Sequence, residues 1–337
     1  MATGLITDPI YLQHDTGENH PEAPQRLVAI HDHLRRTGLL ADLAVASPTP
    51  RPDLSGTITA IHTPAYYNHL KSRAPRSGLV YLDADTPASP DSVAAAERAV
   101  SGVMTAIDGV MTGRWQNAFC ALRPPGHHAE ADRAMGFCLL NNVAIGARYL
   151  QTRYHLSHIL IVDWDVHHGN GTQHLFYNDP AVFYFSTHQY PFYPGTGAAS
   201  ERGAGAGEGT TLNCPLPAGA GDRELLQAFE SALMPAMAQF RPEFILISAG
   251  FDAHRDDPLA QISATDDGFS RMTQVVQTLA ATYCAGRIVS CLEGGYHLGA
   301  LARSAERHLR VLLAAPPFPL RSESVGGHDC PVKARRF

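Results

Sequence analysis

Two short segments hold most of the side chains in this sequence that could do chemistry together. The first is Arg-Pro-Pro-Gly-His-His at 123–128, and the second is Val-Asp-Trp-Asp-Val-His-His-Gly-Asn-Gly at 162–171. Each follows an apolar run, and loops after strands are where α/β proteins assemble their active sites. Ser-Ala-Gly-Phe-Asp-Ala-His at 248–254 adds a carboxylate, and Glu-Gly-Gly-Tyr at 293–296 adds a phenol. Together these four clusters predict a hydrolase that uses one metal ion.

The spacing of the acidic residues favours a metal site. Asp163, Asp165 and His167 occupy every second position at the end of an apolar run. In a continuing strand they would point to one face, and a loop that starts there can turn some of them onto one ion. Asp252 follows the apolar run 244–249 and can complete the site from a neighbouring strand. Two carboxylates and an imidazole balance a divalent cation, and three protein ligands leave a position for water and substrate.

Hydrolysis of an amide also needs a group that moves protons and a group that stabilises an oxyanion. Histidine can do the first near neutral pH, and the stiff Pro-Pro-Gly approach fixes where His127 and His128 are presented. The glycines at 294–295 allow a tight turn that delivers the O–H of Tyr296 to a substrate carbonyl. A lone histidine or an isolated Gly-Gly-Tyr is more often structural, but the neighbouring metal cluster favours catalysis.

Short apolar runs alternate along the chain with segments of helical period. The predicted strands are 4–7, 57–61, 117–122, 158–164, 182–187, 210–214, 244–249 and 287–292. The predicted helices are 24–37, 91–112, 141–154, 222–240, 265–284 and 298–313. Strand followed by helix, repeated, predicts an α/β fold with a mostly parallel central sheet and helices on both faces. We expect one domain at 1–315 and an appended C-terminal tail at 316–337.

Composition limits the partners and the compartment. The chain has 337 residues and a net charge of −6 without a basic stripe, so direct binding of nucleic acid is not expected. No apolar segment approaches the roughly 18 residues of a membrane span, so no membrane partner is expected. The six cysteines lack paired or zinc-finger spacing, and no leader is recognisable, which predicts a cytoplasmic protein with reduced thiols. The sequence does not indicate an oligomeric state.

The four clusters resemble the zinc-dependent histone deacetylase family, in particular its class II enzymes and their bacterial relatives. The resemblance covers nearly the whole chain. Its further motifs are His-Pro-Glu-Ala-Pro-Gln-Arg-Leu at 20–27, Ile-His-Thr-Pro-Ala-Tyr at 61–66, Asp-Ala-Asp-Thr-Pro-Ala-Ser-Pro at 83–90, Gly-Phe-Cys at 136–138 and Asn-Asn-Val-Ala at 141–144. It implies the single-domain arginase–deacetylase fold and hydrolysis of an acyl-lysine-type amide, in a peptide, a protein or a small acylated amine.

The resemblance also implies the metal sites. One catalytic zinc ion would be held by Asp165, His167 and Asp252. Asp163 would orient a catalytic histidine and contribute to a structural potassium ion. The potassium site as a whole would comprise Asp163, Asp165, His167, Ser186 and Thr187. The alternative for Asp163 is a loop cap that accepts backbone N–H bonds.

The resemblance assigns different roles to the two histidines. His128 would be the general base and then the general acid, whereas His127 would be held by Asp163 as an electrostatic group. Asn170 stands where class I enzymes carry aspartate and class II enzymes asparagine. Its expected partner, His128, would then feel one negative charge fewer. The alternative for Asn170 is that it simply starts the short helix through Gln173 and Phe176, an N-cap role that is compatible with the first.

Gly136, Phe137 and Tyr193 match positions that grip the aliphatic stem of acyl-lysine in the family. Tyr193 departs from the usual phenylalanine, and packing in the core is an equally weighted interpretation of the neighbouring Phe192. Leu259 stands where polyamine-selective members carry a glutamate that receives a substrate cation. An apolar side chain there favours acyl-lysine, although an acidic residue such as Asp256 or Asp257 could compensate.

Other functions stay open. The runner-up is an acetylpolyamine or other small-molecule amidohydrolase, and a catalytically silent acyl-lysine-binding protein is a third. Ureohydrolysis of the arginase type is disfavoured, because Gly169 and His254 stand where a second metal would need carboxylates.

Overall fold

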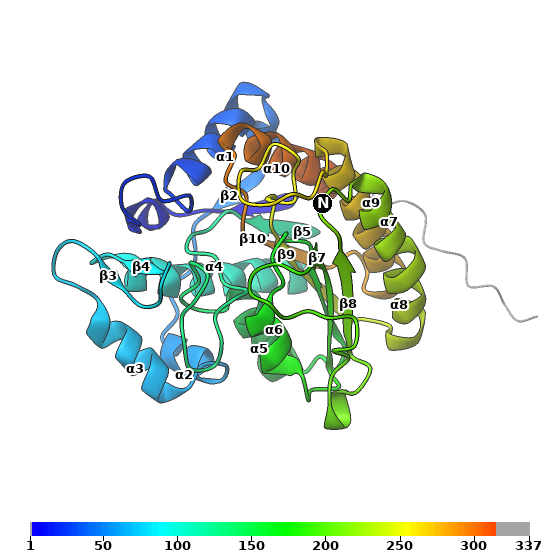
Figure 1. Cartoon of the computed structure of the whole chain (residues 1–337), viewed down its shortest axis with the longest axis horizontal. Helices are drawn as coiled ribbons and strands as arrows, with labels where there is room; N and C mark the ends of the chain where they lie inside the picture. The colour runs from blue at the N-terminus through cyan, green and yellow to red at the C-terminus, as the bar shows by residue number, and fades with distance from the viewer. Residues whose placement is uncertain (1, 315–337) are drawn as a thin grey trace, which may run out of the picture.

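The computed structural model describes residues 2–314, which are built around an eight-stranded sheet (Figure 1). The strand order is β2-β1-β5-β10-β9-β6-β7-β8, and every neighbouring pair runs parallel. The strands are β1 (Thr3–Ile6), β2 (Ala44–Ala46), β5 (Asn117–Cys120), β6 (Ile159–Asp163), β7 (Val182–Gln189), β8 (Thr211–Leu216), β9 (Phe244–Ala249) and β10 (Ile288–Leu292). A separate antiparallel pair joins β3 (Val80–Tyr81) to β4 (Pro87–Ala88).

Helices cover both faces of the sheet. One layer contains α1 (Gln25–Arg36), α7 (Asp222–Ala228), α8 (Met234–Phe240), α9 (Asp266–Tyr283) and α10 (Leu298–Leu313). The other contains α2 (Leu54–Thr59), α3 (Pro64–Arg73), α4 (Ser92–Met111), α5 (Asn142–Tyr154) and α6 (Asn170–Phe176). In the first layer α10 packs against α1 and α9, and in the second α4 packs against α5. The predicted α/β architecture is therefore confirmed.

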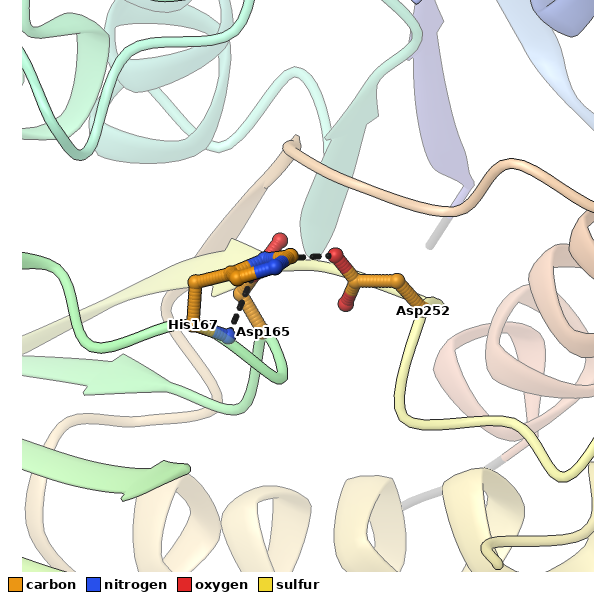
Figure 2. A group of neighbouring side chains, drawn as sticks. All are labelled: Asp165, His167 and Asp252. Carbon is orange, nitrogen blue, oxygen red and sulfur yellow. Dashed lines mark hydrogen bonds and ion pairs between the residues drawn. The ribbon is translucent and has the colours of Figure 1, made fainter. Parts of the chain in front are cut away.

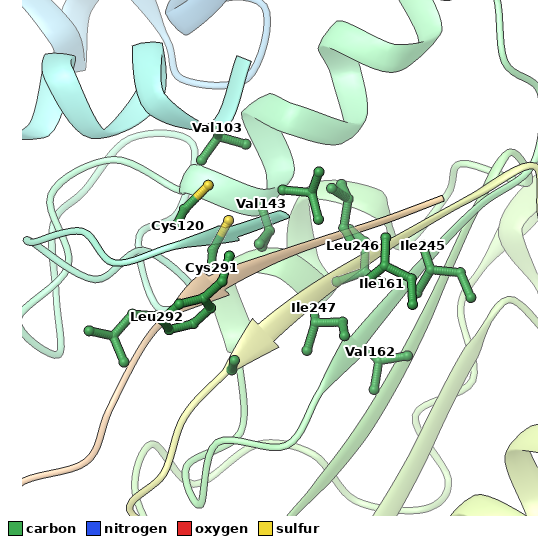
Figure 3. Close-up of a cluster of buried hydrophobic side chains, with 14 of the residues drawn as sticks. Val103, Cys120, Val143, Ile161, Val162, Ile245, Leu246, Ile247, Cys291 and Leu292 are labelled. Carbon is green, nitrogen blue, oxygen red and sulfur yellow. The ribbon is translucent and has the colours of Figure 1, made fainter. Parts of the chain in front are cut away.

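The central strands consist of apolar residues because both of their faces are buried. β6 and β9 are hydrogen-bonded neighbours, and Ile161 and Leu246 are fully buried. Figure 3 shows these side chains packed with those of β10 and the helix layer above. A strand that faces solvent on one side would alternate instead, so the continuous apolar runs indicated this central position.

Two predicted elements differ from the structure. The segment 57–61 was predicted as a strand from its β-branched residues, but Leu54–Thr59 is helical. Leu54, Ile58 and Ile61 follow helical spacing, and the last two are buried in the core. The predicted helix 222–240 is interrupted between α7 and α8 by a π-helical turn at Phe229–Leu233. Pro235 follows this turn and has no N–H to donate, which accounts for the irregularity.

Further expectations concern membrane spans, the cysteines and the C-terminal tail. No helix within residues 2–314 is long and apolar enough to cross a membrane. The five cysteines in this range, which are Cys120, Cys138, Cys214, Cys284 and Cys291, are free thiols. The predicted tail at 316–337 and the sixth cysteine, Cys330, lie outside the described residues.

All the strands of the large sheet present their carboxyl ends to one edge. The loops after β5, β6, β9 and β10 start there, and these strands lie side by side in the sheet. In open parallel sheets ligands bind outside this edge. The four clusters of reactive side chains follow these four strands.

The packing of the sheet gives a stability prediction. Leu246→Ala removes a fully buried side chain from β9 and should lower the free energy of unfolding by about 2–5 kcal/mol. Val45→Ala, on edge strand β2, is the control, because Val45 is 50% exposed and should cost less than about 1 kcal/mol. Urea denaturation measures both variants. Equal destabilisation would show that Leu246 does not occupy the core.

Candidate metal centre and active site

Three buried side chains converge at the carboxyl edge of the sheet. Asp165 and His167 lie in the loop after β6, and Asp252 lies in the loop after β9, the strand beside β6. Figure 2 shows the three side chains pointing toward one another. One ligand atom from each lies within 4.8 Å of the other two. The residues that the resemblance named as zinc ligands are thus brought together.

By themselves these three side chains leave buried negative charge uncompensated. His167 Nδ1 lies 3.1 Å from Asp165 Oδ1 and 3.2 Å from Asp252 Oδ2. Burial opposes the charged imidazole, but the two carboxylates outweigh it and raise the pKa of His167 to about 10. Asp252 Oδ2 is buried and receives no hydrogen bond from any residue in the described range. A divalent cation would replace the proton on His167 and satisfy this oxygen, and the donor set suits zinc.

The loop after β10 passes so close to the carboxylates that it has no room for a side chain. A Cβ on Gly294 would overlap Oδ2 of Asp252 and Oδ2 of Asp165. The Gly294 N–H instead donates to Asp165 Oδ2 at 2.7 Å. Gly295 has a φ of +119°, which favours glycine. The glycine pair therefore makes the tight approach expected from the sequence.

His127 is held by a carboxylate behind it. Its Nδ1 lies 3.0 Å from Oδ2 of the fully buried Asp163. Burial lowers the pKa of His127, but the charges of Asp163 and Asp165 outweigh burial and raise it to about 10. Asp163 Oδ1 also accepts the N–H of Asp165 at 3.2 Å, so Asp163 caps the loop as well as contacting the histidine. The contact with Asp163 therefore holds the ring of His127 and favours its protonated form.

His128 faces the same site but has a different partner. Its Nδ1 lies 2.8 Å from Asn170 Oδ1. Burial, reinforced by the positive charges of His127 and His167, holds the pKa of His128 well below its ordinary value. Asn170 also starts α6, as the alternative expected, although the N-cap itself is the preceding residue, Gly169. His128 is therefore neutral at physiological pH.

Tyr296 lies between β10 and α10, beside the loop glycines. The Arg26 guanidinium is 5.1 Å from the centre of its ring, and the Phe137 ring packs edge-on at 5.9 Å. Burial and the negative charge of Asp252 hold the pKa of the phenol well above its ordinary value. The O–H stays protonated and can donate a hydrogen bond.

Two of the residues expected to line a channel, Gly136 and Tyr193, lie against His128. The Tyr193 ring packs edge-on against His128 at 5.2 Å. Gly136 and Phe137 both have positive φ, and a Cβ on Gly136 would overlap the His128 ring and lie 3.0 Å from the Tyr193 hydroxyl. Phe192 is half-buried, and its ring stacks on that of His167, a candidate zinc ligand, with 5.5 Å between the ring centres. The alternative that Phe192 packs in the core is therefore wrong.

Leu259 lies in a depression near these aromatic residues. A cavity of about 350 Å³ is lined by Leu259, by Phe192 and by residues next to each of them in the sequence, together with Ala218. Asp257 is not available to compensate for the missing charge, because its carboxylate accepts the N–H groups of Tyr296 at 2.6 Å and of Leu259 at 3.1 Å. Asp256 is exposed and pairs with Arg303, at 3.3 Å.

Of the residues expected at a potassium site, Asp163 ends β6, Ser186 and Thr187 lie on the adjacent strand β7, and Asp165 and His167 lie in the loop after β6. Asp163 pairs in register with Ser186, and Ser186 Oγ lies 2.8 Å from His188 Nδ1. The hydroxyl of Thr187 is buried and has no hydrogen-bond partner within residues 2–314. His168 contacts the side chains of Thr196 and Gln173, which hold it within the loop.

Some residues that build the site had no assigned role in the sequence. Glu293 Oε2 accepts the N–H groups of Gly126 at 2.6 Å and of His127 at 3.2 Å, which fixes the histidine loop. Arg26 Nε donates to the Gly295 carbonyl at 2.7 Å and so holds the tyrosine loop. Both residues stand inside motifs of the sequence, and Glu293 follows an apolar strand. A charged side chain directly after a buried strand was the feature of the sequence that could have indicated a role in the site.

Comparison with known proteins agrees with this geometry. A family model of the histone deacetylase domain matches residues 20–312. A probable deacetylase of Archaeoglobus fulgidus is 38% identical over 324 residues, which cover 95% of this chain and 88% of that protein. The polyamine deacetylase HDAC10 of Mus musculus is 38% identical over 324 residues, covering 91% of this chain and 47% of that protein.

A solved structure gives the same result for the fold. The crystal structure of the HDA15 HD domain matches with a TM-score of 0.88 at 38% identity, covering 93% of this chain and 88% of that one. The architecture is therefore the arginase–deacetylase fold expected from the sequence. With the family model spanning most of the sequence and relatives aligned along nearly all of it, this chain belongs to the histone deacetylase family.

Proposed function

We propose that the protein is a zinc-dependent amidohydrolase that removes the acyl group from an acyl-lysine-type amine. The observation that carries this proposal is the convergence of Asp165, His167 and Asp252 beside a neutral His128. Family membership supports a deacetylase, and the donor set supports a single catalytic zinc ion. A bound divalent cation would polarise the substrate carbonyl and lower the pKa of a water molecule.

The two histidines divide the proton chemistry between them. His128 is neutral and holds a free ring nitrogen, so it can accept a proton from the attacking water and later give it to the leaving amine. His127 already carries its proton and is held by Asp163. It acts as a fixed positive group that stabilises negative charge developing on the substrate. Different environments thus give adjacent imidazoles different roles.

Tyr296 completes the chemistry as the donor to the substrate oxyanion. Its phenol is protonated, and the loop that carries it is fixed by Arg26 and by the N–H···carboxylate contact to Asp257. A donor that is already positioned stabilises the developing charge without reorganisation. This explains why so many buried contacts converge on a short glycine turn.

Substrate choice rests on the rim of the site. The Tyr193 ring packs against His128 and the Phe137 ring against Tyr296, and both rings can pack along an aliphatic stem. Leu259 offers no charge to a distal ammonium group. We therefore favour acyl-lysine in a peptide or protein. An acetylated polyamine is the second candidate, because the related HDAC10 of Mus musculus is named a polyamine deacetylase.

We also propose a structural potassium ion beside Asp163. Its support is the register that pairs Asp163 with Ser186, together with the unpartnered buried hydroxyl of Thr187 within the described range. Asp165 and His167, in the loop that leaves the same strand, would complete the site.

Metal removal tests the nucleophile. Chelation should abolish hydrolysis of an acetyl-lysine peptide, and added zinc should restore it, because activation of water depends on the cation. Asp252→Asn should lower zinc affinity and turnover together. Asp256→Asn is the matched control, since that carboxylate is exposed and pairs with Arg303. Full turnover by a chain shown to be metal-free would contradict the mechanism.

Removal of the phenol tests the oxyanion donor. Tyr296→Phe keeps the ring over Arg26 and should lower kcat by about 10² to 10³, the range for loss of such a donor. Tyr283→Phe is the matched control, because Tyr283 stacks under Arg241 away from the site. Steady-state kinetics on folded variants measure both. Unchanged kcat in Tyr296→Phe would leave Tyr296 with a structural role only.

Competition between substrates tests the assignment of Leu259. Wild-type protein should prefer an acetyl-lysine peptide to acetylspermidine. Leu259→Glu should shift the ratio of the two kcat/KM values toward the polyamine by roughly 1–3 kcal/mol. Leu12→Glu places the same charge on an exposed residue elsewhere and should leave the ratio unchanged. A wild-type preference for acetylspermidine would reverse the order of the two candidate substrates.

A further inference from the structure

The carboxylate of Glu130 lies behind Asn170, on the side away from His128. Asn170 Oδ1 is 2.8 Å from His128 Nδ1, and Asn170 Nδ2 donates to Glu130 Oε1 at 2.7 Å. The same amide nitrogen contacts the sulfur of Met135 at 3.3 Å. Glu130 is only 8% exposed. The three side chains therefore form a buried line from the reactive histidine to an acidic group.

The acidic group decides which way the amide of Asn170 points. An ionised carboxylate can only accept hydrogen bonds, so the NH₂ group must face Glu130 and the carbonyl oxygen must face His128. A flipped amide would place its oxygen against the carboxylate and its NH₂ group against the ring nitrogen. The amide oxygen in turn requires a proton on Nδ1 of His128. The other nitrogen, Nε2, then keeps its lone pair.

Glu130 has enough donors around it to remain ionised. His174 Nδ1 lies 3.0 Å from Oε2, and Arg133 Nη2 donates to Oε1 at 2.9 Å. Burial raises the pKa of this carboxyl group, but the hydrogen bonds from Arg133, His174 and Asn170 outweigh burial and lower it. Both His174 and Arg133 are largely exposed, at 72% and 61% of their side chains. The line of contacts thus ends at the surface.

We propose that Glu130 is a positioning residue that orients the Asn170 amide and thereby keeps His128 in the tautomer that can accept a proton at Nε2. The inference rests on the proposed function, because it takes His128 as the base. It also revises the expectation that asparagine simply removes a negative charge from this histidine. A negative charge is still present, on Glu130, but Asn170 separates it from His128. It acts on His128 by fixing the direction of the Asn170 amide.

Substitution of Glu130 tests this orientation. Glu130→Leu removes the acceptor, so the amide can flip, and kcat should fall at least about tenfold with little change in KM. A histidine fixed entirely in the wrong tautomer costs roughly 10⁴-fold in a serine protease, which sets an upper limit. Glu130→Gln should retain most of the activity, because its amide oxygen can accept from both Arg133 and Asn170. His174→Ala, which removes an exposed donor from the same carboxylate, should stay within about twofold of wild type.

A paired exchange gives the sharper result. Asn170→Asp alone places two carboxylates against each other and should lower kcat. Asn170→Asp combined with Glu130→Gln should recover activity, because the glutamine NH₂ group can then donate to Asp at 170 while an oxygen still faces His128. Arg133, which is 61% exposed, can turn away from that NH₂ group into solvent. A residue that only maintains local packing would not show this recovery. Unchanged kcat in Glu130→Leu, no recovery in the double variant, or an equal loss in His174→Ala would overturn the proposal.

A second readout does not depend on activity. Long-range ¹H–¹⁵N correlation spectra of the zinc-loaded chain report which ring nitrogen of His128 carries the proton, and His128→Ala identifies the signals. Wild type should show the Nδ1–H tautomer, and Glu130→Leu should show a mixture of both tautomers. An Nε2–H tautomer in wild type, or no change in Glu130→Leu, would contradict the role of Glu130. If wild-type protein hydrolysed none of the substrates, the proposed function would fail while this test still stood.

Discussion

Four carboxylates are buried together at the carboxyl edge of the sheet, and the rest of the site depends on how their charge is compensated. Asp163, Asp165, Asp252 and Glu293 are each at most 1% exposed. Buried charges are stable only when they are paired and hydrogen-bonded. His127 compensates Asp163, and backbone N–H groups bind Glu293. Asp165 and Asp252 also accept backbone N–H groups, but they share the imidazole of His167, which lies between them, and this makes their position the natural one for a cation.

The same requirement ties distant parts of the chain to the site. Arg123 and Arg26 both bind the fully buried Glu22, with Arg123 Nη2 2.7 Å and Arg26 Nη1 3.0 Å from its carboxylate oxygens. Arg123 begins the histidine loop, and Arg26 donates to backbone carbonyls of the tyrosine loop at Glu293 and Gly295. One buried ion network from the N-terminal segment thus fixes both the histidine loop and the tyrosine loop. Breaking one partner would leave an uncompensated charge in the interior.

Much of this organisation could be predicted from the sequence. Continuous apolar runs predicted the central strands, and the side chains that follow them predicted the position of the site at one sheet edge. The sequence did not predict the contacts that hold the site residues and their loops in place. Glu130, Asp257 and Glu293 act through backbone N–H groups or another side chain, and these contacts join segments far apart in the chain. The segment 57–61, which was wrongly predicted as a strand, shows a second limit of the sequence. Its few apolar residues fit a strand or a helix, and the burial of Ile58 in the core selects the helix.

The central claim is that Asp165, His167 and Asp252 hold one catalytic zinc ion. Zinc-edge X-ray absorption on the loaded chain, with metal content measured for wild type and Asp252→Asn, tests it most directly. The expected result is one zinc ion per chain, bound by nitrogen and oxygen atoms at about 2.0–2.2 Å, with binding weakened in the variant. A sulfur ligand at about 2.3 Å, or equal zinc affinity in both proteins, would contradict the account.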